Sequence, residues 1–364
     1  QPSSRDWGEI RFNINSRGIL QNTILRYGSN SSRYATVFNN GGNIDFVDSE
    51  ISYYDFGFKQ NLGTSTISYS FFRNNGNGTG FYINDGVANV SSSSFYDHYN
   101  SFSASGGTLN IVNNNFVNSR FGAGFIDTAV DFNNSGNTAT GTGIKGLIIG
   151  GFIDRGFILQ KDTIPYIIGH LIVNAGGVLT INPGVIMKFG PPFYFGNLDI
   201  NGLLLVNGSS DNRVYFTSIK DDSIGGDTNG DGAATFPNSS DYIGLTFNAR
   251  SFGLIKNSVF RYGGGFPVIC HLSSGGNYAC GVIKNFGGFV NISNSQITNN
   301  YDGTVGVNGI IQSAIYRNVR WGADGSTSAQ NNFWGDPSGP YHPTQNPNGR
   351  GDRVSDNVNF RPWL

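Results

Sequence analysis

The residues best suited to chemistry are the acidic and amide side chains of segment 221–232, DDSIGGDTNGDG. Asp227, Asn229 and Asp231 stand at alternate positions and a glycine follows them. Calcium takes several oxygen ligands, and this spacing places three on one side of a tight loop, as in the first half of an EF-hand loop. The closing glutamate of that loop is missing, since Phe236 stands near its position. A solvated acidic turn is the alternative to a site at which Ca²⁺ pins the loop. The predicted calcium ligands are Asp221, Asp222, Asp227, Asn229 and Asp231.

The two cysteines offer a second kind of chemistry. Cys270 and Cys280 both stand in a Gly-rich insertion, residues 266–287. In an exported protein they would close a short loop as a disulfide, which chain-entropy reasoning values at roughly 2–3 kcal/mol. A metal site that also uses His271 is the alternative, but it needs further ligands. We therefore predict a Cys270–Cys280 disulfide.

The elements that must position these residues are given by an internal repeat. Residues 6–28, DWGEIRFNINSRGILQNTILRYG, align without gaps with residues 241–263, DYIGLTFNARSFGLIKNSVFRYG, at a constant offset of 235. Apolar residues mostly alternate with polar ones in both copies, and Gly and Asn mark the corners, which is typical of strands joined by turns. The repeat therefore predicts the same set of strands at two places in the chain.

A shorter period of about 22 residues runs beneath the long repeat, and such a period fits either a leucine-rich repeat or a β-solenoid. Similar strand pairs begin at Gly18, Gly42, Gly63, Gly86 and Gly107. The sequence lacks an L-x-x-L-x-L framework and a helical half-repeat. The solenoid is therefore favoured, with each turn supplying two or three short strands that stack in parallel on the next turn.

Composition agrees with an all-β chain and limits its partners. Of the 364 residues, 53 are Gly, 29 Phe and 17 Tyr, whereas the strong helix formers Glu and Met are nearly absent. The net charge of -1 without a basic run argues against nucleic-acid binding. No apolar run reaches 18 residues, so we expect no membrane-spanning helix.

We predict an all-β fold, a right-handed parallel β-helix with irregular loops. Residues 1–143 would hold the turns of a first repeat unit and residues 144–364 those of a second. Residues 331–364, rich in Pro, Asn and Gly, would form an irregular layer over one end. Pairs such as Tyr53-Tyr54 and Phe71-Phe72 would place one ring in the core and the other outside. Asn is expected at the corners, where it tolerates a left-handed backbone and can bond to its neighbour in the next turn. The Asn residues concerned are Asn22, Asn113, Asn114, Asn115, Asn257 and Asn294.

Several phrases resemble those of a known family. GGVLTINPGVIMKF, LDINGLLLVNGSSDNRVYFTSIKDD, GGDTNGDG and NFWGDPSGPYHP are similar to segments of bacterial secreted or cell-surface right-handed parallel β-helix proteins of the pectin-lyase-like superfamily. The resemblance covers most of residues 144–364 and, through the repeat, residues 6–28. It implies the fold and a secreted or cell-surface location, but it does not imply one activity, because function depends on the site and not on the fold.

Catalysis is the less favoured interpretation. Within the family that the chain resembles, an enzyme would be a polysaccharide lyase or a glycoside hydrolase, and hydrolysis needs two acids that flank one bond. Asp45, Asp48, Glu50 and Asp55 are neighbours in sequence, and stacked turns could bring Arg73 or Asp97-His98 close. The pattern does not place them on one face, so we predict no catalytic residue. A polysaccharide remains a second expected partner.

The leading prediction is a structural extracellular or cell-surface solenoid that stacks on copies of itself. The first residue, Gln1, falls inside a repeat unit, which predicts a mature form or a fragment of a longer chain. A solenoid has two edges of unpaired backbone groups, and such edges invite strand pairing. Complementary ends that meet head to tail would generate a filament. The predicted assembly residues are Trp7, Ile10, Phe12, Phe360, Trp363 and Leu364.

Overall fold

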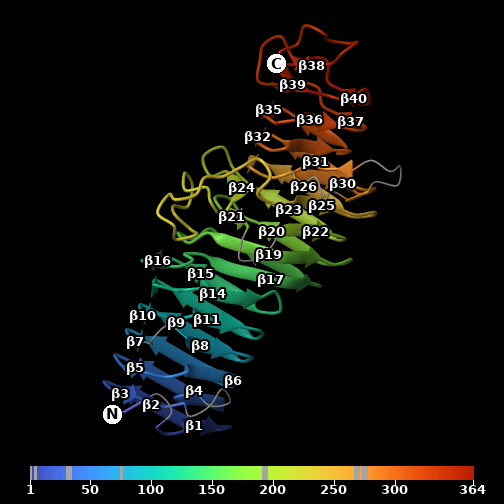
Figure 1. Cartoon of the computed structure of the whole chain (residues 1–364). Helices are drawn as coiled ribbons and strands as arrows, with labels where there is room; N and C mark the ends of the chain where they lie inside the picture. The colour runs from blue at the N-terminus through green and yellow to red at the C-terminus, as the bar shows by residue number, and fades with distance from the viewer. Residues whose placement is uncertain are drawn as a thin grey trace. The chain divides into compact units, whose positions relative to one another are not determined.

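The chain forms a parallel β-solenoid of about 13 turns, which confirms the predicted fold class. It divides into two compact units (Figure 1). Unit 1 comprises residues 1–149, 162–166 and 225–234, and unit 2 comprises residues 150–161, 167–224 and 235–364. The predicted division between residues 143 and 144 stays a prediction. The computed structural model describes residues 2–3, 6–29, 35–73, 77–190, 196–265, 271–272 and 278–364.

Unit 1 is built from three parallel faces, and each turn contributes one strand to each face. The first face contains β1 (Ile10–Asn13), β8 (Thr79–Ile83), β11 (Asn100–Ala104) and β14 (Gly122–Asp127), with the first parts of β4 (Val37–Val47) and β6 (Phe56–Ser68). The second contains β2 (Arg17–Gln21), β9 (Val87–Ser91), β12 (Thr108–Val112) and β15 (Asp131–Ser135), with the second parts of β4 and β6. The third contains β3 (Ile24–Arg26), β5 (Glu50–Ser52), β7 (Phe71–Arg73), β10 (Ser94–Tyr96), β13 (Asn115–Val117) and β16 (Thr138–Thr140).

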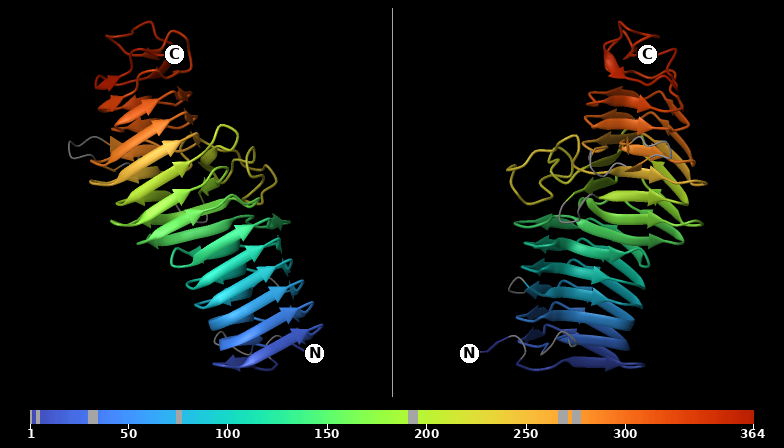
Figure 2. Two further views of the ribbon diagram at one scale, coloured as in Figure 1. Left: turned by 180° about the vertical axis from the view of Figure 1, so that it is seen from behind. Right: turned by 45° about the vertical axis from the view of Figure 1, so that its right-hand side comes forward.

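Unit 2 repeats the three-faced plan, and the strands of one face run in the same direction (Figure 2). Two strands, β17 (Leu147–Ile153) and β19 (Tyr166–Val173), begin in unit 1 and end in unit 2. The first face contains β22 (Asn197–Ile200), β25 (Gly244–Phe247), β30 (Ile283–Asn285), β33 (Asp302–Val305) and β36 (Trp321–Asp324). The second contains β18 (Gly156–Leu159), β20 (Val178–Ile181), β23 (Leu203–Asn207), β26 (Phe252–Lys256), β31 (Phe289–Ser293), β34 (Gly309–Ile311), β37 (Thr327–Ser328) and β40 (Val358–Asn359). The third contains β21 (Ile186–Phe189), β24 (Val214–Ser218), β27 (Ser258–Arg261), β32 (Gln296–Thr298) and β35 (Ala314–Tyr316).

Two short pairs of strands lie outside these faces. They are the antiparallel pair β28 (His271–Leu272) and β29 (Tyr278–Ala279), and the parallel pair β38 (Pro340–Tyr341) and β39 (Gly351–Arg353). None of the described segments is a helix, so the described chain contains no helix that is long and apolar enough to cross a membrane.

The core of unit 1 consists of stacked rings, because equivalent residues of successive turns lie about 4.8 Å apart. The rings of Phe72 and Phe95 stack with centroids 4.7 Å apart, and both side chains are buried. Phe71, the neighbour of Phe72, is 40% exposed, and Tyr53 is likewise exposed beside buried Tyr54. The prediction that one ring of each pair points outward is confirmed.

The corners depend on residues with a left-handed backbone. Asn22, Asn113, Asn257 and Asn294 have φ between 47° and 55°. Asn accepts this conformation more readily than most residues because its short polar side chain can bond locally. The predicted corner role of these residues is confirmed.

Buried polar side chains link successive turns of unit 1 just after this corner. The backbone N–H of Ser49 donates to Ser70 Oγ, and that of Ser93 donates to Asn114 Oδ1. Asn114 in turn donates from its backbone to Asn137 Oδ1. Each turn therefore satisfies a buried donor of the preceding turn, which an apolar core could not do.

The internal repeat appears as two turns with the same backbone, which we call turn 6–28 and turn 241–263. At an offset of 235, β2 and β26 cover equivalent residues, and each repeat segment supplies one strand to each face. Ser16 and Ser251 each close their corner with a hydroxyl bond of 2.6 Å to the carbonyl three residues before. The repeat read from the sequence is therefore a repeat of structure.

Residues 331–364 form the predicted irregular layer, which we call the C-terminal layer. Trp334 and Phe360 are buried within it, at 0% and 1% exposure. Its strand β40 pairs with β37, the preceding strand of the second face. The C-terminal layer thus covers this end of unit 2.

Candidate functional site

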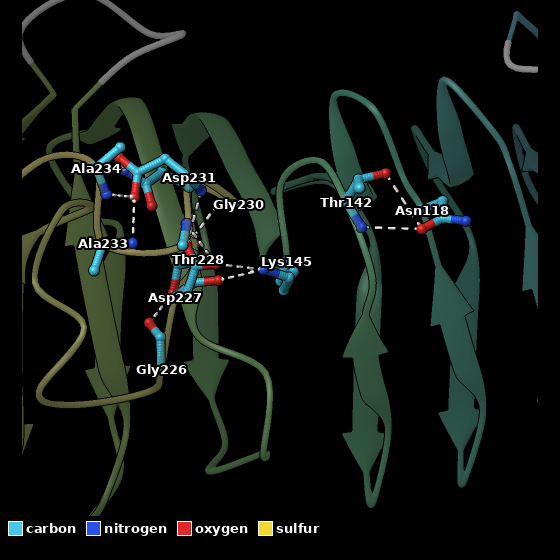
Figure 3. A network of polar contacts seen from close by, with 12 residues as sticks. Asn118, Thr142, Lys145, Gly226, Asp227, Thr228, Gly230, Asp231, Ala233 and Ala234 are labelled. Atoms are coloured by element: carbon cyan, nitrogen blue, oxygen red, sulfur yellow. Dashed lines mark hydrogen bonds and ion pairs between the residues drawn. The ribbon is translucent and has the colours of Figure 1, made fainter.

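The acidic loop predicted to bind calcium is held to unit 1 by a lysine (Figure 3). Lys145 Nζ donates to Asp227 Oδ2 and to the Asp227 carbonyl, both at 2.9 Å. The Lys145 backbone N–H also donates to the carbonyl of buried Thr228 at 2.8 Å. The lysine ammonium therefore supplies a positive charge beside Asp227, at the carboxylate where a metal ion was expected.

Asp227 and Asp231 also organise the backbone of this loop. Asp227 Oδ1 accepts from the N–H groups of Gly230 and Asp231, and its Oδ2 accepts from Gly232 N–H. Asp231 Oδ1 accepts from the N–H groups of Ala233 and Ala234, and its Oδ2 accepts from Asn229 Nδ2 at 2.8 Å. One oxygen of Asp227 and one of Asp231 lie within 4.8 Å of each other. These are suitable donors for a hard cation, but each already serves the loop or Lys145.

The protonation of Asp227 follows from these contacts. Burial raises its pKa, but the hydrogen bonds and charge of Lys145, with the N–H groups of Gly232 and Gly230, outweigh burial and lower it below the usual value. Asp227 therefore remains ionised under mildly acidic conditions and keeps its attraction for Lys145.

The other two predicted ligands, Asp221 and Asp222, belong to unit 2. Asp221 is 2% exposed, and its Oδ2 lies 2.6 Å from both Arg261 Nε and Arg261 Nη2. Its Oδ1 accepts from Ser223 Oγ at 2.7 Å. The Asp221 carboxylate thus forms a buried ion pair at the end of β27 and fixes the start of the loop.

The predicted disulfide concerns Cys280, which is buried at 5% exposure, and Cys270, which lies outside the described residues. Most of the insertion 266–287 around them is likewise not described. The disulfide therefore stays a prediction.

Of the acidic residues considered for catalysis, Glu50 is engaged in two ion pairs on the third face of unit 1. Glu50 lies 3.6 Å from Arg26 on one side and 3.6 Å from Arg73 on the other. The Arg73 guanidinium also stacks on the Tyr96 ring, 4.7 Å from its centroid. This arrangement stabilises the outer surface of stacked turns, and we assign no catalytic role to it.

Sequence reasoning did not find a buried pair in the core of unit 1. Tyr54 Oη and His98 Nε2 lie 2.6 Å apart. Burial lowers the pKa of His98 to about 3 and raises that of Tyr54 well above its usual value, so both are neutral at physiological pH. The two residues are 44 positions apart in sequence, so no local motif reveals the pair.

The predicted assembly residues fall at two different kinds of surface. Trp7, Ile10 and Phe12 belong to turn 6–28 and are only partly buried. In the C-terminal layer Phe360 is buried, Trp363 is partly buried and Leu364 is 62% exposed. Trp363 packs on Gly339 and donates from Nε1 to the Pro337 carbonyl at 3.2 Å. An apolar surface is thus accessible in both regions. Among the described strands, the three of turn 6–28 pair on one side only.

A groove of about 510 Å³ lies in unit 2, outside strands β31, β34 and β37. Gly309 leaves room in it, and the Asn291 side chain lies across this glycine. Ile311, Asn331, Arg361 and Pro362 also line it. The groove offers amide groups, one guanidinium and an apolar wall.

Comparison with known proteins does not add to this picture: no family model, no curated protein and no solved structure matches the chain.

Proposed function

We propose that the chain is a structural β-solenoid of the cell surface or extracellular matrix, and that it joins end to end with other solenoids through turn 6–28. In the simplest arrangement, copies of the chain stack head to tail, with the C-terminal layer of one copy against turn 6–28 of the next. The resemblance to surface β-helix proteins of the pectin-lyase-like superfamily supports the location.

One observation carries this proposal. Ile10, Phe12, Leu20 and Leu25 point into the core of turn 6–28 but are only partly buried. Their equivalents in turn 241–263 are Leu245, Phe247, Ile255 and Phe260, each at 1% exposure or less. An apolar face of this kind, bordered by strands that pair on one side only among the described residues, favours the stacking of a further solenoid turn.

Association of copies can be tested by light scattering and electron microscopy over a wide range of protein concentrations. Ile24→Asp places a charge at the edge of turn 6–28, where Ile24 is 61% exposed. Ile158→Asp is the matched control, because Ile158 is also an exposed isoleucine, at 49%, but lies on the second face of unit 2. We expect the first variant to abolish end-to-end particles and the control to keep them. Single particles of the unmodified chain at every concentration would exclude the stacking of copies.

Calcium enters the proposal as a competitor of Lys145. An ion bound by Asp227, Asn229 and Asp231 would have to displace the lysine ammonium from Asp227. Lys145→Met removes the internal positive charge, so Ca²⁺ should bind the variant more tightly than the unmodified chain, as measured by calorimetry. Asp231→Asn in the Lys145→Met background is the control and should weaken that binding. Equal calcium binding by the unmodified chain and Lys145→Met would contradict this competition.

A carbohydrate-active or glycan-binding role is the second candidate, favoured by the groove outside β31 and β34. On the same face, at the start of β26 and β31, the exposed rings of Phe252 and Phe289 stack with centroids 5.0 Å apart, and apolar rings with nearby amides suit a sugar. Asn291→Ala and Phe289→Ala should then lower affinity in a glycan-binding screen, and release of sugar fragments would identify an enzyme. The structural role predicts neither effect.

A further inference from the structure

The direction of the buried Tyr54–His98 hydrogen bond follows from the groups around it. Among the described residues, His98 Nδ1 is buried and has no hydrogen-bond partner. If Nε2 carried the imidazole proton, the Tyr54 hydroxyl hydrogen and the Nδ1 lone pair would both lack a partner in the described part of the chain. If Tyr54 Oη donates to Nε2 at 2.6 Å, the Nδ1 hydrogen alone lacks one. Each buried unpaired polar group is costly, so we assign Nε2 as the acceptor of the phenolic proton.

The other two fully buried tyrosines among the described residues have acceptors of a different kind. Tyr166 and Tyr242 are at most 1% exposed, like Tyr54. Tyr166 Oη donates to Asn134 Oδ1, and Tyr242 Oη donates to the Phe216 carbonyl, both at 3.0 Å. Amide oxygens are very weak bases, whereas a neutral imidazole nitrogen readily accepts a proton. Tyr54 is therefore a buried phenol with a base in hydrogen-bond reach.

The pair is enclosed by the backbone of two neighbouring turns. A Cβ at Gly57 would lie 2.9 Å from Tyr54 Cζ, and one at Gly80 would lie 3.1 Å from His98 Nε2. Burial raises the pKa of Tyr54 well above its usual value and lowers that of His98 to about 3. The pair therefore consists of a phenol and a neutral imidazole at physiological pH, and Tyr54 keeps its proton for as long as it keeps its electrons.

Loss of an electron from Tyr54 would change this balance, because an oxidised phenol is a strong acid. Its O–H bond breaks and an N–H bond forms at His98 Nε2, which leaves a neutral phenoxyl radical and an imidazolium. The electron passes to the oxidant. The proton moves along a hydrogen bond that exists before the reaction, so the two groups are already oriented for the transfer.

Tyr53 connects this pair with the surface. Its ring is 40% exposed and stacks on the Tyr27 ring with centroids 5.2 Å apart. Tyr53 directly precedes Tyr54 in the chain, so the path of the electron between them is short. A phenoxyl radical formed at Tyr53 would be reduced by an electron from Tyr54 and a proton from water.

We propose that Tyr54 and His98 form a redox site for one-electron oxidants such as peroxyl radicals, at which Tyr54 gives the electron and His98 Nε2 takes the phenolic proton. The peroxyl radical takes up the electron with a proton from water and becomes a hydroperoxide. The radical that remains is held in the core of unit 1, where it is kept from coupling with a tyrosine of another chain. This site is independent of the joining of solenoids.

The test oxidises the full chain with photo-oxidised tris(bipyridine)ruthenium and follows the phenoxyl radical by electron paramagnetic resonance and transient absorption. We expect a long-lived radical that Tyr54→Phe removes. Tyr242→Phe is the matched control and should leave this radical unchanged, because Tyr242 is equally buried but donates to a carbonyl. His98→Gln keeps a hydrogen-bonding side chain without a base and should slow formation of the Tyr54 radical by about 100-fold. Circular dichroism checks the fold of each variant.

The unmodified chain supplies a second readout that needs no variant. Because the proton stays inside the protein, the rate of Tyr54 oxidation should be constant between about pH 5 and 8, where His98 is neutral. Oxidation of exposed tyrosines should become faster as the pH rises, because their protons go to solvent. A long-lived radical that persists in Tyr54→Phe would overturn the proposal. An equal rate in folded His98→Gln, or a rate that rises with pH, would show that His98 takes no proton and that the contact is only a hydrogen bond of the core.

Discussion

Turn 6–28 in unit 1 and turn 241–263 in unit 2 share sequence pattern, strands and corner conformations but differ in burial. Phe247 is fully buried, whereas Phe12 is only partly buried. Both rings pack against a glycine of their own turn, Gly253 and Gly18. The local geometry is thus the same with or without a covering turn.

The difference separates two sources of stability. Corner conformations and ring-on-glycine contacts are set within a turn and depend on its own residues. Burial of the core side chains is set by neighbouring turns, and it stabilises by about 25 cal/mol for each Å² of apolar surface removed from water. Matched substitutions at positions 235 residues apart should therefore separate the local contribution from that of the neighbours.

Lowering the pH should have the largest effect on stability. It should destabilise unit 1 through His98 and stabilise unit 2 through Asp352. His98 in unit 1 has a folded pKa of about 3, below its unfolded value near 6.5, so its contribution is full above about pH 6.5 and is lost as the pH falls towards 3. Burial raises the pKa of Asp352 in unit 2 to about 6, so this group stabilises unit 2 as the pH falls from 7 to 4. As the pH falls, hydrogen exchange measured separately for each unit should show that the amides of unit 1 lose protection before those of unit 2. His98→Gln should remove the acid sensitivity that unit 1 shows before Asp227 becomes protonated. Equal loss of exchange protection in both units would contradict the assignment to His98.

Truncation of the core rings should give the next largest effect. Phe247→Ala removes a fully buried ring and should lower the free energy of unfolding of its region by about 3–5 kcal/mol. Phe12→Ala should lower it by about half as much or less, because the ring is partly exposed before the change. Denaturant unfolding measures the loss of free energy of unfolding in each variant. Hydrogen exchange of the β2 and β26 amides then shows which turn is destabilised. Equal losses would mean that Phe12 is covered in solution.

A methyl group at the glycine should test how firmly each ring is held. A Cβ at Gly253 would lie 2.4 Å from the Phe247 ring, and one at Gly18 would lie 2.0 Å from the Phe12 ring. The Phe247 ring is enclosed, so Gly253→Ala should destabilise by about 1–3 kcal/mol. In Gly18→Ala the Phe12 ring can turn towards the open side, and the loss should be smaller despite the closer contact. A larger loss at Gly18 would show that distance, and not room to move, decides the effect.

Much of the fold could be predicted from the sequence because its determinants are local. Alternation of apolar and polar residues identified the strands, and Gly and Asn identified the corners. The 235-residue offset is kept by β2 and β26. The pairing of one buried ring with one exposed ring, as in Phe72 and Phe71, followed from the same alternation.

The environment of the acidic loop could not be predicted, because it depends on contacts that no local pattern records. Lys145 lies 82 residues from Asp227 in sequence. Residues 225–234 pack with unit 1, although they interrupt the turns of unit 2. The acids themselves were found because their spacing is local, whereas the lysine that faces them requires the three-dimensional arrangement.

Alanine at the corner residues Asn22 and Asn257 should have the smallest effect on stability, and this effect should be nearly equal in the two turns. Asn22 and Asn257 have φ of 50° and 47°, and a left-handed backbone costs an alanine roughly 1–2 kcal/mol more than a glycine. Asn22→Ala and Asn257→Ala should each destabilise by about 1 kcal/mol, while Asn22→Gly should change stability by only a few tenths. Asn257 Nδ2 also donates to the Gly208 carbonyl at 2.8 Å, a contact made by the covering side of the turn. If Asn257→Ala lowers the free energy of unfolding more than Asn22→Ala does, the difference measures this single hydrogen bond. The part of the loss that the two variants share measures the corner conformation. If the two alanine variants differed as much as the two phenylalanine variants, the corner would depend on its neighbours, and the separation of local from neighbour contributions would fail.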